Sequence, residues 1–355
     1  PTQFYPGSVL GIITDLASAV KENDLAQIKI ILSQLGKTPF FKNKKPTPYD
    51  EAVSLTWYLS NVFYNSISNI YKYIKSNIFD GEDFNNDIIN LGFWPGGDRD
   101  GNPFVTTEIT LSTARKLRSD VIKNYYRDIR KLRRRLTFKN IDTIVFNIEN
   151  RLYKSIFNDD NPPEISLEEL KSKLYQIKEI LTNEHKSLFI DDLDDLINKV
   201  NIFGYHFASL DIRQDSRIHS KVFENIFKIA QKSLIKIFPT NYLNLSEEKK
   251  IKVLSSIKRN IPLDHFKDEL AISTLGSIRA MKTIQNANGE KGSNRYIISN
   301  NQSSLNILEV FTMFRLSDWE SPSVDIIPLF ETISDLKVAS MVMESVYRNK
   351  LYRDH

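Results

Sequence analysis

Residues 201–215 read NIFGYHFASLDIRQD, a mainly apolar run that ends in the polar letters RQD. The same form returns at 295–302 (RYIISNNQ) and at 324–332 (VDIIPLFET), and residues 91–94, which precede the polar end at 96–99 (GGDR), are a fourth candidate. Each run predicts a buried strand that delivers polar groups at its carboxyl end, and a helical segment follows. This recurrence is the topology of parallel βα units. In closed barrels of such units, catalytic side chains gather at the carboxyl ends of the strands.

Most of the remaining sequence has the period of amphipathic helices, with apolar residues at i, i+3 and i+4. Ser166, followed three residues later by Glu169, predicts a capping box at one helix start. The expected helical segments are 9–35, 49–77, 107–138, 141–157 and 166–181. We therefore expect a helix-dominated α/β fold, namely an incomplete parallel α/β barrel, similar to a TIM barrel, with many added helices. It would form one partial catalytic domain over 1–355, helical over roughly 1–200 and built of barrel units over roughly 200–355, with the loop 92–103 joining the site.

The composition is that of an ordinary globular protein, with 41% hydrophobic and 26% charged residues and a net charge of +4. No apolar run reaches the length of about 20 residues that a bilayer requires, and the sequence has no signal-peptide pattern. The absence of cysteine excludes disulfides and thiolate metal sites and suits a reducing compartment, so we expect a cytoplasmic location. The basic stretch 115–135 contains an apolar stripe, which favours a solvated helix face over nucleic-acid binding.

The densest motif is residues 92–103, GFWPGGDRDGNP, which brings glycines, prolines, aspartates, a tryptophan and an arginine into one loop. Glycines permit a positive φ and a close backbone approach, so such a loop can place Arg99, Asp98 and Asp100 accurately. The alternative is a tight connector between helices, because Asp-Gly-Asn-Pro is ordinary turn chemistry.

Two further candidates stand at the ends of predicted strands. Arg213 has a planar fork that can bind carboxylate or phosphate, and the alternative is a structural ion pair with Asp211 or Asp215. Glu331 offers the oxygen ligand that Mg²⁺ or Mn²⁺ prefers, although a carboxylate at a helix start is the simpler explanation when Glu331 is taken alone. We expect Arg213 and Glu331 to project from neighbouring strands toward a common pocket beside the Gly96–Gly97 turn.

The five histidines show no metal-ligand spacing. His206 lies in the strand-like run and is expected to be a core or strand residue rather than a catalyst. His219 follows the Arg213 block and is a minor candidate for the site.

Taken together and in their order, these blocks resemble the phosphoenolpyruvate carboxylase family. The family's GGDRDGNP block stands at 96–103, its LDIRQ block at 210–214 and its PLFET block at 328–332. The opening 1–3 (PTQ) is similar to the end of the family's TAHPTE motif, and 295–299 resembles the strand before PLFET. The resemblance covers essentially the whole chain. It implies a lyase that converts phosphoenolpyruvate and bicarbonate to oxaloacetate and phosphate with Mg²⁺ or Mn²⁺, assembled as a homotetramer, without nucleic-acid or membrane partners.

The resemblance also implies roles for individual residues. Glu331 would be one of the metal-binding carboxylates, and Arg213 would bind phosphate. Trp94 and Leu329 would line the apolar pocket in which CO₂ waits, beside the backbone of Gly96 and Gly97. Arg99, Asp98 and Asp100 belong to the loop that borders the site, and the individual role of Arg99 is left open.

The resemblance further implies that parts of the active site are missing from this chain. The family's general-base histidine precedes the Pro-Thr pair, and its second metal carboxylate lies beyond His355, so both ends look like cuts through a longer protein. We therefore expect the isolated polypeptide not to carboxylate phosphoenolpyruvate, and metal-dependent oxaloacetate formation in a coupled assay would refute this. The competing hypothesis is a non-catalytic helical module with a regulatory or scaffolding role.

Overall fold

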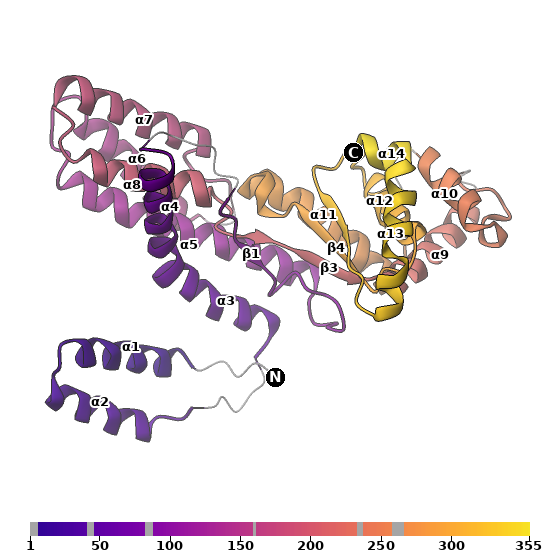
Figure 1. The fold of residues 1–355 in the computed structure, drawn as a ribbon, viewed down its shortest axis with the longest axis horizontal. Coiled ribbons are helices and arrows are strands. Elements are labelled where there is room, and N and C mark those ends of the chain that lie inside the picture. The colour runs from indigo at the N-terminus through magenta and orange to yellow at the C-terminus, as the bar shows by residue number, and fades with distance from the viewer. Residues whose placement is uncertain (1–5, 41–45, 82–87, 159–160, 233–236, 258–265) are drawn as a thin grey trace.

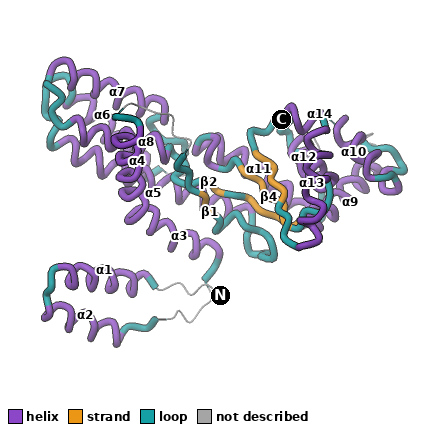
Figure 2. Tube along the Cα trace, in the orientation of Figure 1, coloured by secondary structure: helices purple, strands orange, loops and turns teal. Residues whose placement is uncertain are grey.

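The computed structural model describes residues 6–40, 46–81, 88–158, 161–232, 237–257 and 266–355. Helices dominate, and the short strands lie between a group of helices on the left of the view and another on the right (Figure 1, Figure 2). This confirms the prediction of a helix-dominated α/β chain. Among the helices of the described residues, none combines the length and the apolar character that a membrane span requires. The similarity of 1–3 to a family motif concerns residues outside the described ranges.

The first two helices, α1 (Gly7–Lys21) and α2 (Leu25–Lys37), form a hairpin at the lower left of Figure 1. The predicted helical segment 9–35 is interrupted because Asn23 adopts a positive φ of 56°. Asp24 then caps α2 by accepting hydrogen bonds from the amides of Ala26 and Gln27. The facing apolar side chains form a small hydrophobic cluster separate from the main core, and it comprises Ile12, Leu16, Ala19, Ile28, Ile31 and Leu35.

The next helices build a bundle around one long helix. The predicted segment 49–77 is observed as α3 (Pro48–Tyr58), the π-helical turn η1 (Leu59–Phe63) and α4 (Tyr64–Ile78), which follow one another without a break. The long helix α5 (Thr107–Arg133) spans about 40 Å and ends at Arg133, before the predicted Phe138. It packs against α3, α6 (Asp142–Ile156), α8 (Ile190–Phe203) and α11 (Glu269–Asn288). Its apolar stripe is buried as expected, at Leu117, Val121, Ile129 and Leu132.

The start of α7 (Leu167–Glu184) confirms the predicted cap only in part. The hydroxyl of Ser166 accepts a hydrogen bond from the amide of Glu169 at 3.1 Å, as the capping box requires. The Glu169 carboxylate, however, is bound by the guanidinium of Arg151 on α6. A charge-assisted bidentate pair is stronger than a neutral bond to a backbone amide, so the reciprocal half of the capping box is lost.

All strand pairings are parallel within the described residues. β1 (Gly92–Phe93) pairs with β2 (Ser209–Leu210), and β3 (Ile212–Asp215), β4 (Arg295–Ser299) and β5 (Asp325–Pro328) form a sheet in that order. A single bridge between Asp98 and Arg213 joins the segment after β1 to β3. Three helices follow β3, β4 and β5 directly, namely α9 (Ser216–Lys232), α12 (Ser304–Leu316) and α13 (Ile333–Arg348). The predicted βα units are confirmed, whereas closure into a barrel stays a prediction.

The prediction that 201–212 is one strand-like run is wrong in its first half. Residues up to Phe203 belong to the end of α8, and a turn follows in which Gly204 and Phe207 have positive φ values of 48° and 62°. His206 lies in this turn rather than in a strand. A fully buried helix end and a fully buried strand are equally apolar, so the letters alone could not separate them.

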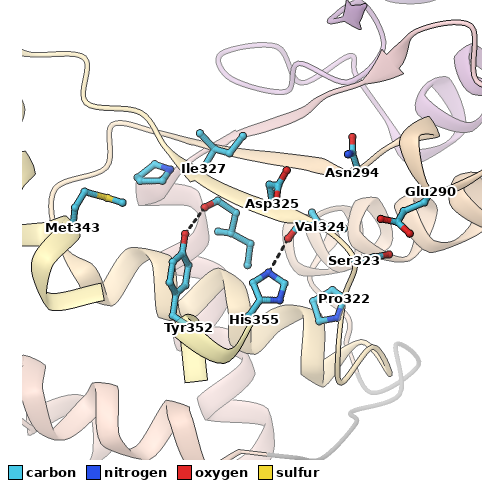
Figure 3. A pocket seen from close by; sticks show the side chains of 12 residues that line it. Glu290, Asn294, Pro322, Ser323, Val324, Asp325, Ile327, Met343, Tyr352 and His355 are labelled. Carbon is cyan, nitrogen blue, oxygen red and sulfur yellow. Dashed lines mark hydrogen bonds between the residues drawn. The ribbon is translucent and has the colours of Figure 1, made fainter. Parts of the chain in front are cut away.

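The outer edge of β5 is covered by the short helix α14 (Lys350–Asp354) and the residue that follows it (Figure 3). The Tyr352 hydroxyl donates to the carbonyl of Ile326 at 3.0 Å, and His355 Nε2 lies 2.9 Å from the carbonyl oxygen of Val324. Pro328 has no amide proton on the same edge. A pocket of about 520 Å³ lies along this edge. These contacts occupy groups with which another strand would pair.

Candidate active site

The loop 92–103 is held against β3 by its backbone. The Arg99 amide donates to the Arg213 carbonyl at 2.9 Å, and the Arg213 amide donates to the Gly97 carbonyl at 3.1 Å. A Cβ at Gly97 would lie 2.0 Å from the carbonyl oxygen of Asp211, and Gly96 combines a φ of 84° with contact to a threonine of α5. The two glycines therefore permit the close approach that the motif predicts.

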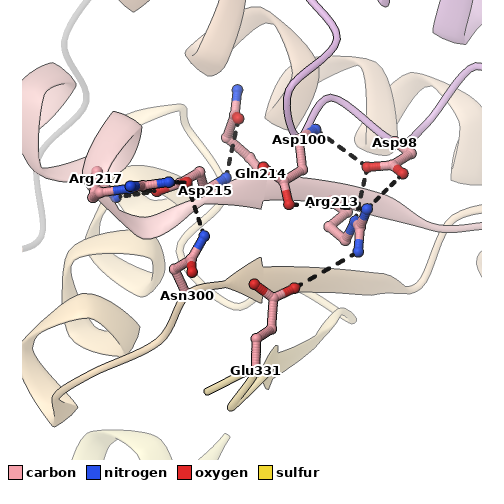
Figure 4. Close-up of polar contacts among 8 residues, drawn as sticks. All are labelled: Asp98, Asp100, Arg213, Gln214, Asp215, Arg217, Asn300 and Glu331. Atoms are coloured by element: carbon pink, nitrogen blue, oxygen red, sulfur yellow. Dashed lines mark hydrogen bonds and ion pairs between the residues drawn. The ribbon is translucent and has the colours of Figure 1, made fainter. Parts of the chain in front are cut away.

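Arg213 is the centre of a charged cluster (Figure 4). Its Nε and Nη2 donate to the two carboxylate oxygens of Asp98, each at 2.8 Å. Asp100 and Glu331 each have a carboxylate oxygen 3.9 Å from a guanidinium nitrogen of Arg213. The hydrogen bonds with Asp98 raise the pKa of Arg213 above its ordinary value, so the guanidinium stays charged. We refer to Asp98, Asp100, Arg213 and Glu331 as the Arg213 cluster.

Neither of the aspartates that were the alternative partners of Arg213 pairs with it. Asp211 binds Arg295, and Asp215 binds Arg217 on the next turn of chain, with an additional hydrogen bond from Asn300 at 3.0 Å. Burial would raise the pKa of Asp215, but its hydrogen bonds from Arg217 lower the pKa overall. The counter-ion of Arg213 thus comes from the distant glycine-rich loop, which sequence spacing could not show.

Glu331 and Arg213 face each other, but their strands are not neighbours. Arg213 lies on β3 and Glu331 follows β5, while β4 runs between the two strands. The expectation of neighbouring strands is therefore wrong, whereas the two side chains do lie close, with Glu331 Oε1 3.9 Å from Arg213 Nη1. That they form a functional site stays a prediction. Leu329 continues the pairing with β4, because its amide donates to the Ile298 carbonyl at 2.9 Å. It is half-buried and lies two residues before Glu331.

Trp94 covers one face of the Arg213 guanidinium. The guanidinium carbon lies 4.6 Å from the centre of the indole ring, within the range of a cation–π contact. The indole also donates a hydrogen bond to Asp211, whose other partner is Arg295 Nε at 2.7 Å. Burial raises the pKa of Asp211, and Arg295 opposes that rise. Sequence reasoning missed this supporting role of Asp211 and Arg295, which only the pairing of β2 with β1 reveals.

Arg99 does not join the Arg213 cluster. Asp98 and Asp100 lie near Arg213, whereas the Arg99 side chain extends toward α11. Its side chain donates to the carbonyl of Ser273 on α11 at 3.1 Å and to the Ser273 hydroxyl. Arg99 lines a second cavity together with Gln214.

Of the two histidines of this region, His219 is fully buried and His206 is partly buried, and the pKa of each lies below its ordinary value. Burial lowers the pKa of His219 to about 3, and its Nε2 lies 2.8 Å from the Tyr296 hydroxyl. Burial, with the charges of Lys291 and Lys171, lowers the pKa of His206 to about 4. His219 is therefore a core residue that contacts Tyr296 of β4, and its surroundings indicate a structural role rather than a catalytic one.

The described residues do not by themselves form a cation site. They contain no group of three or more His, Asp or Glu side chains arranged to hold a metal ion. Asp98 is hydrogen-bonded by Arg213, whereas Asp100 and Glu331 each lie 3.9 Å from its guanidinium. A divalent cation at this place would have one ligand in Glu331 and would need others from beyond the described residues.

Comparison with known proteins gives a consistent result along the chain. The family model described as phosphoenolpyruvate carboxylase matches residues 13–165 and 153–355. A phosphoenolpyruvate carboxylase of Trichormus variabilis is 27% identical over 397 residues, which cover 95% of this chain and 38% of that protein. A phosphoenolpyruvate carboxylase of Nitrosomonas eutropha is 25% identical over 419 residues, covering 99% of this chain and 44% of that protein. The chain therefore spans less than half the length of these curated relatives.

Proposed function

This chain belongs to the phosphoenolpyruvate carboxylase family, and on that premise we propose that it supplies part of an active site that converts phosphoenolpyruvate and bicarbonate to oxaloacetate and phosphate. The observation that carries the proposal is the Arg213 cluster, in which Trp94 and Asp98 hold the guanidinium toward Glu331. The non-catalytic helical module is disfavoured, because the matching relatives carry the name of an enzyme.

The proposed role of Arg213 is to bind an anionic group of the substrate. Asp98 takes the Nε and Nη2 donors on one edge of the guanidinium, which leaves Nη1 directed toward Glu331. A guanidinium fixed in this way stabilises negative charge on a phosphoryl or carboxylate oxygen without having to reorganise. The indole of Trp94 lies on its face and limits the access of water to that charge. We propose that Leu329 extends the same apolar wall, beside Gly96 and Gly97.

Glu331 is proposed as one carboxylate ligand of the Mg²⁺ or Mn²⁺ that the family resemblance implies. The metal supplies electrostatic stabilisation of developing negative charge when it is bound. Since the described residues do not complete a cation site, no step of the reaction is assigned to the metal here. Asp98 and Asp100 are proposed to act through Arg213, by fixing its orientation, rather than by touching the metal.

The wider context of the site follows the same premise. We propose that the strands β3–β5 and the loop 92–103 belong to a parallel α/β barrel of which residues 200–355 form a part, with residues 1–200 as its helical addition. A cytoplasmic enzyme that assembles as a homotetramer fits the family resemblance. We also propose that the 355-residue chain alone is inactive, because it spans 38–44% of the length of the relatives that it matches.

The proposal is tested by ligand binding to the protein extended to the length of its relatives. Calorimetric titration with Mn²⁺ and then phosphoenolpyruvate should show binding of both. Arg213→Ala should weaken phosphoenolpyruvate at least about tenfold, because it removes the charged fork, and Glu331→Ala should weaken Mn²⁺ by a similar factor.

Arg217→Ala is the matched control, since Arg217 is an exposed arginine paired with Asp215 outside the Arg213 cluster. It should bind both ligands as the unsubstituted protein does. If Arg213→Ala and Arg217→Ala have the same phosphoenolpyruvate affinity, the proposed role of Arg213 is wrong.

A further inference from the structure

Arg99 is a buried cation that has no counter-ion in the part of the chain that the structure describes. Its side chain and backbone are 8% exposed, and no carboxylate of the described residues forms an ion pair with it. Its two hydrogen-bond acceptors, the carbonyl and the hydroxyl of Ser273, are both neutral. Burial lowers the pKa of Arg99 from its ordinary value, which reflects the cost of this environment. Buried charges in proteins are normally paired or ligated, so Arg99 departs from the general pattern.

Part of the Arg99 guanidinium still lacks a partner. The group has five N–H donors, of which Nη1 and Nη2 each give one to Ser273. Nε is buried and has no hydrogen-bond partner within the described residues. An orphaned charged donor of this kind is costly unless something else satisfies it. A structural link between the loop and α11 accounts for the bonds to Ser273, but it leaves the positive charge of Arg99 without a counter-ion among the described residues.

The side chain lines a cavity large enough for a small ligand. The cavity measures about 850 Å³, and its polar lining includes Asn102, Gln214 and the Ser273 hydroxyl. Two acidic residues of the lining already have partners. Asp215 is paired with Arg217, and Asp268 caps α11 by accepting a hydrogen bond from the amide of Ala271. The remaining carboxylates of the lining are Asp100, which approaches Arg213, and Glu269, an exposed residue in the first turn of α11.

We infer that the Arg99 cavity binds a small oxyanion, a carboxylate or a phosphate group, through the free donors of Arg99. An oxyanion would supply the missing counter-ion and accept from the remaining hydrogens of Nη1 and Nη2, while amide and hydroxyl donors of the lining would complete its hydrogen bonds. Asp98 and Arg213 do not line this cavity, and Asp100 is the residue of the Arg213 cluster that borders it, so the Arg99 site is distinct from the contacts of Arg213. It requires neither substrate nor metal at Arg213 and goes beyond the proposed function.

The site is tested by equilibrium dialysis of the 355-residue chain against radiolabelled inorganic phosphate and, separately, against labelled acetate. The two probes distinguish a phosphate site from a carboxylate site, and binding of either one supports the inference when Arg213→Gln keeps it and Arg99→Gln weakens it. Arg99→Gln should lower the affinity of this site at least about tenfold by removing the charge. Arg213→Gln is the matched variant on the other side of the loop and should leave the Arg99 site intact.

Asn102→Asp is a second, nearly isosteric variant. The Asn102 carbonyl oxygen accepts from the amide of Phe104 at 3.2 Å, and an aspartate oxygen can keep that turn while adding negative charge to the lining. It should weaken the anion about fivefold or more by repulsion. Circular dichroism checks the fold of every variant. If folded Arg99→Gln binds both probes like the unsubstituted chain, the inference fails. If Arg99→Gln does not fold, unchanged binding by Asn102→Asp overturns it instead.

Discussion

The guanidinium of Arg213 gives two donors to Asp98, and its flat face lies against the ring of Trp94. The side chains of Arg213 and Asp98 are 18% and 27% exposed, so solvent screens part of their attraction. The value of the pair therefore lies more in fixed orientation than in stability.

At the level of single residues, the sequence could predict the candidate side chains but not their directions. The sequence identified Arg213, Asp98 and Glu331 as candidate site residues, but it could not show that the Arg99 side chain points away from these three.

Substitution of Gly97 should show how tightly the loop must fit. A Cβ in Gly97→Ala would lie 2.0 Å from the carbonyl oxygen of Asp211, so either the loop or β3 must shift. We expect the free energy of unfolding, measured by urea denaturation, to fall by about 3 kcal/mol or more.

Gly11→Ala is the control for the glycine substitution, because Gly11 lies within α1 with nothing near its missing Cβ. That change should leave the unfolding of the main body unchanged and raise the stability of the α1–α2 hairpin by about 0.5–1 kcal/mol through helix propensity. Equal stability of the Gly97→Ala and unsubstituted proteins would contradict the close approach.

The burial of His219 predicts a dependence of stability on pH. Its pKa in the folded chain is about 3, whereas an unfolded histidine titrates near pH 6.5. Between these values the unfolded chain binds a proton that the folded chain does not. This residue's contribution is therefore fully present above about pH 6.5 and is lost as the pH falls toward 3. Between about pH 7.5 and about pH 5 the loss should be roughly 2 kcal/mol in the free energy of unfolding.

The measurement is urea unfolding of the unsubstituted chain and of His219→Gln over this pH range. The glutamine amide can still reach the Tyr296 hydroxyl but does not titrate. The difference in stability between the two proteins should shrink as the pH falls. Parallel pH curves would show that His219 accepts a proton freely in the folded chain.

At the scale of elements, the most local signals were the most reliable. Amphipathic periods predicted the helices, and apolar runs with polar ends predicted β4 and β5, because neighbouring residues decide these patterns. The errors arose where a distant partner decides. Glu169 gives its carboxylate to Arg151 rather than to its own helix start, and residues 201–203 continue α8 because the surrounding core, not their period, holds them. The local pattern also could not predict the order of the strands in the sheet, in which β4 lies between β3 and β5.

Two serines at helix starts allow a matched test of capping. The Ser166 hydroxyl accepts from the amide of Glu169 at the start of α7, while Ser246 before α10 (Glu247–Ser256) makes no such side-chain bond. Ser166→Ala should therefore lower the free energy of unfolding by about 1 kcal/mol. Ser246→Ala should change it by less than about 0.5 kcal/mol. Chemical denaturation measures both, and equal losses would mean that the cap bond contributes nothing.

At the scale of the whole molecule, apolar side chains of the described residues fall into two clusters. The larger one runs through the helical bundle and the βα units, and the smaller one belongs to the α1–α2 hairpin alone. Parts that share few buried contacts unfold with separate free energies. The active-site cluster depends on the larger body, because Asp98, Arg213 and Glu331 meet only when the loop and the strands are assembled. The sequence predicted these residues as candidates, but only the arrangement of the loop and the strands brings them together.

Substitution within each cluster should separate the two parts. Ile31→Ala in the hairpin should speed amide exchange of residues 7–37, measured by mass spectrometry, and leave exchange in the rest of the chain unchanged. Ile177→Ala removes a side chain that is fully buried in the larger cluster and should lower global stability by about 2–5 kcal/mol. Faster exchange throughout the chain in Ile31→Ala would show that the hairpin and the main body unfold as one unit.

The indole of Trp94 also gives this chain an intrinsic optical reporter. A guanidinium against its ring changes the electronic surroundings of the chromophore, and Trp94 meets Arg213 only after chain segments far apart in sequence have joined. Helices form from local contacts in about a microsecond, while non-local pairing of parallel strands is much slower. The change in Trp94 fluorescence would therefore report the last stage of refolding. Trp57 and Trp319, which lie elsewhere in the chain, also emit and contribute to the total signal.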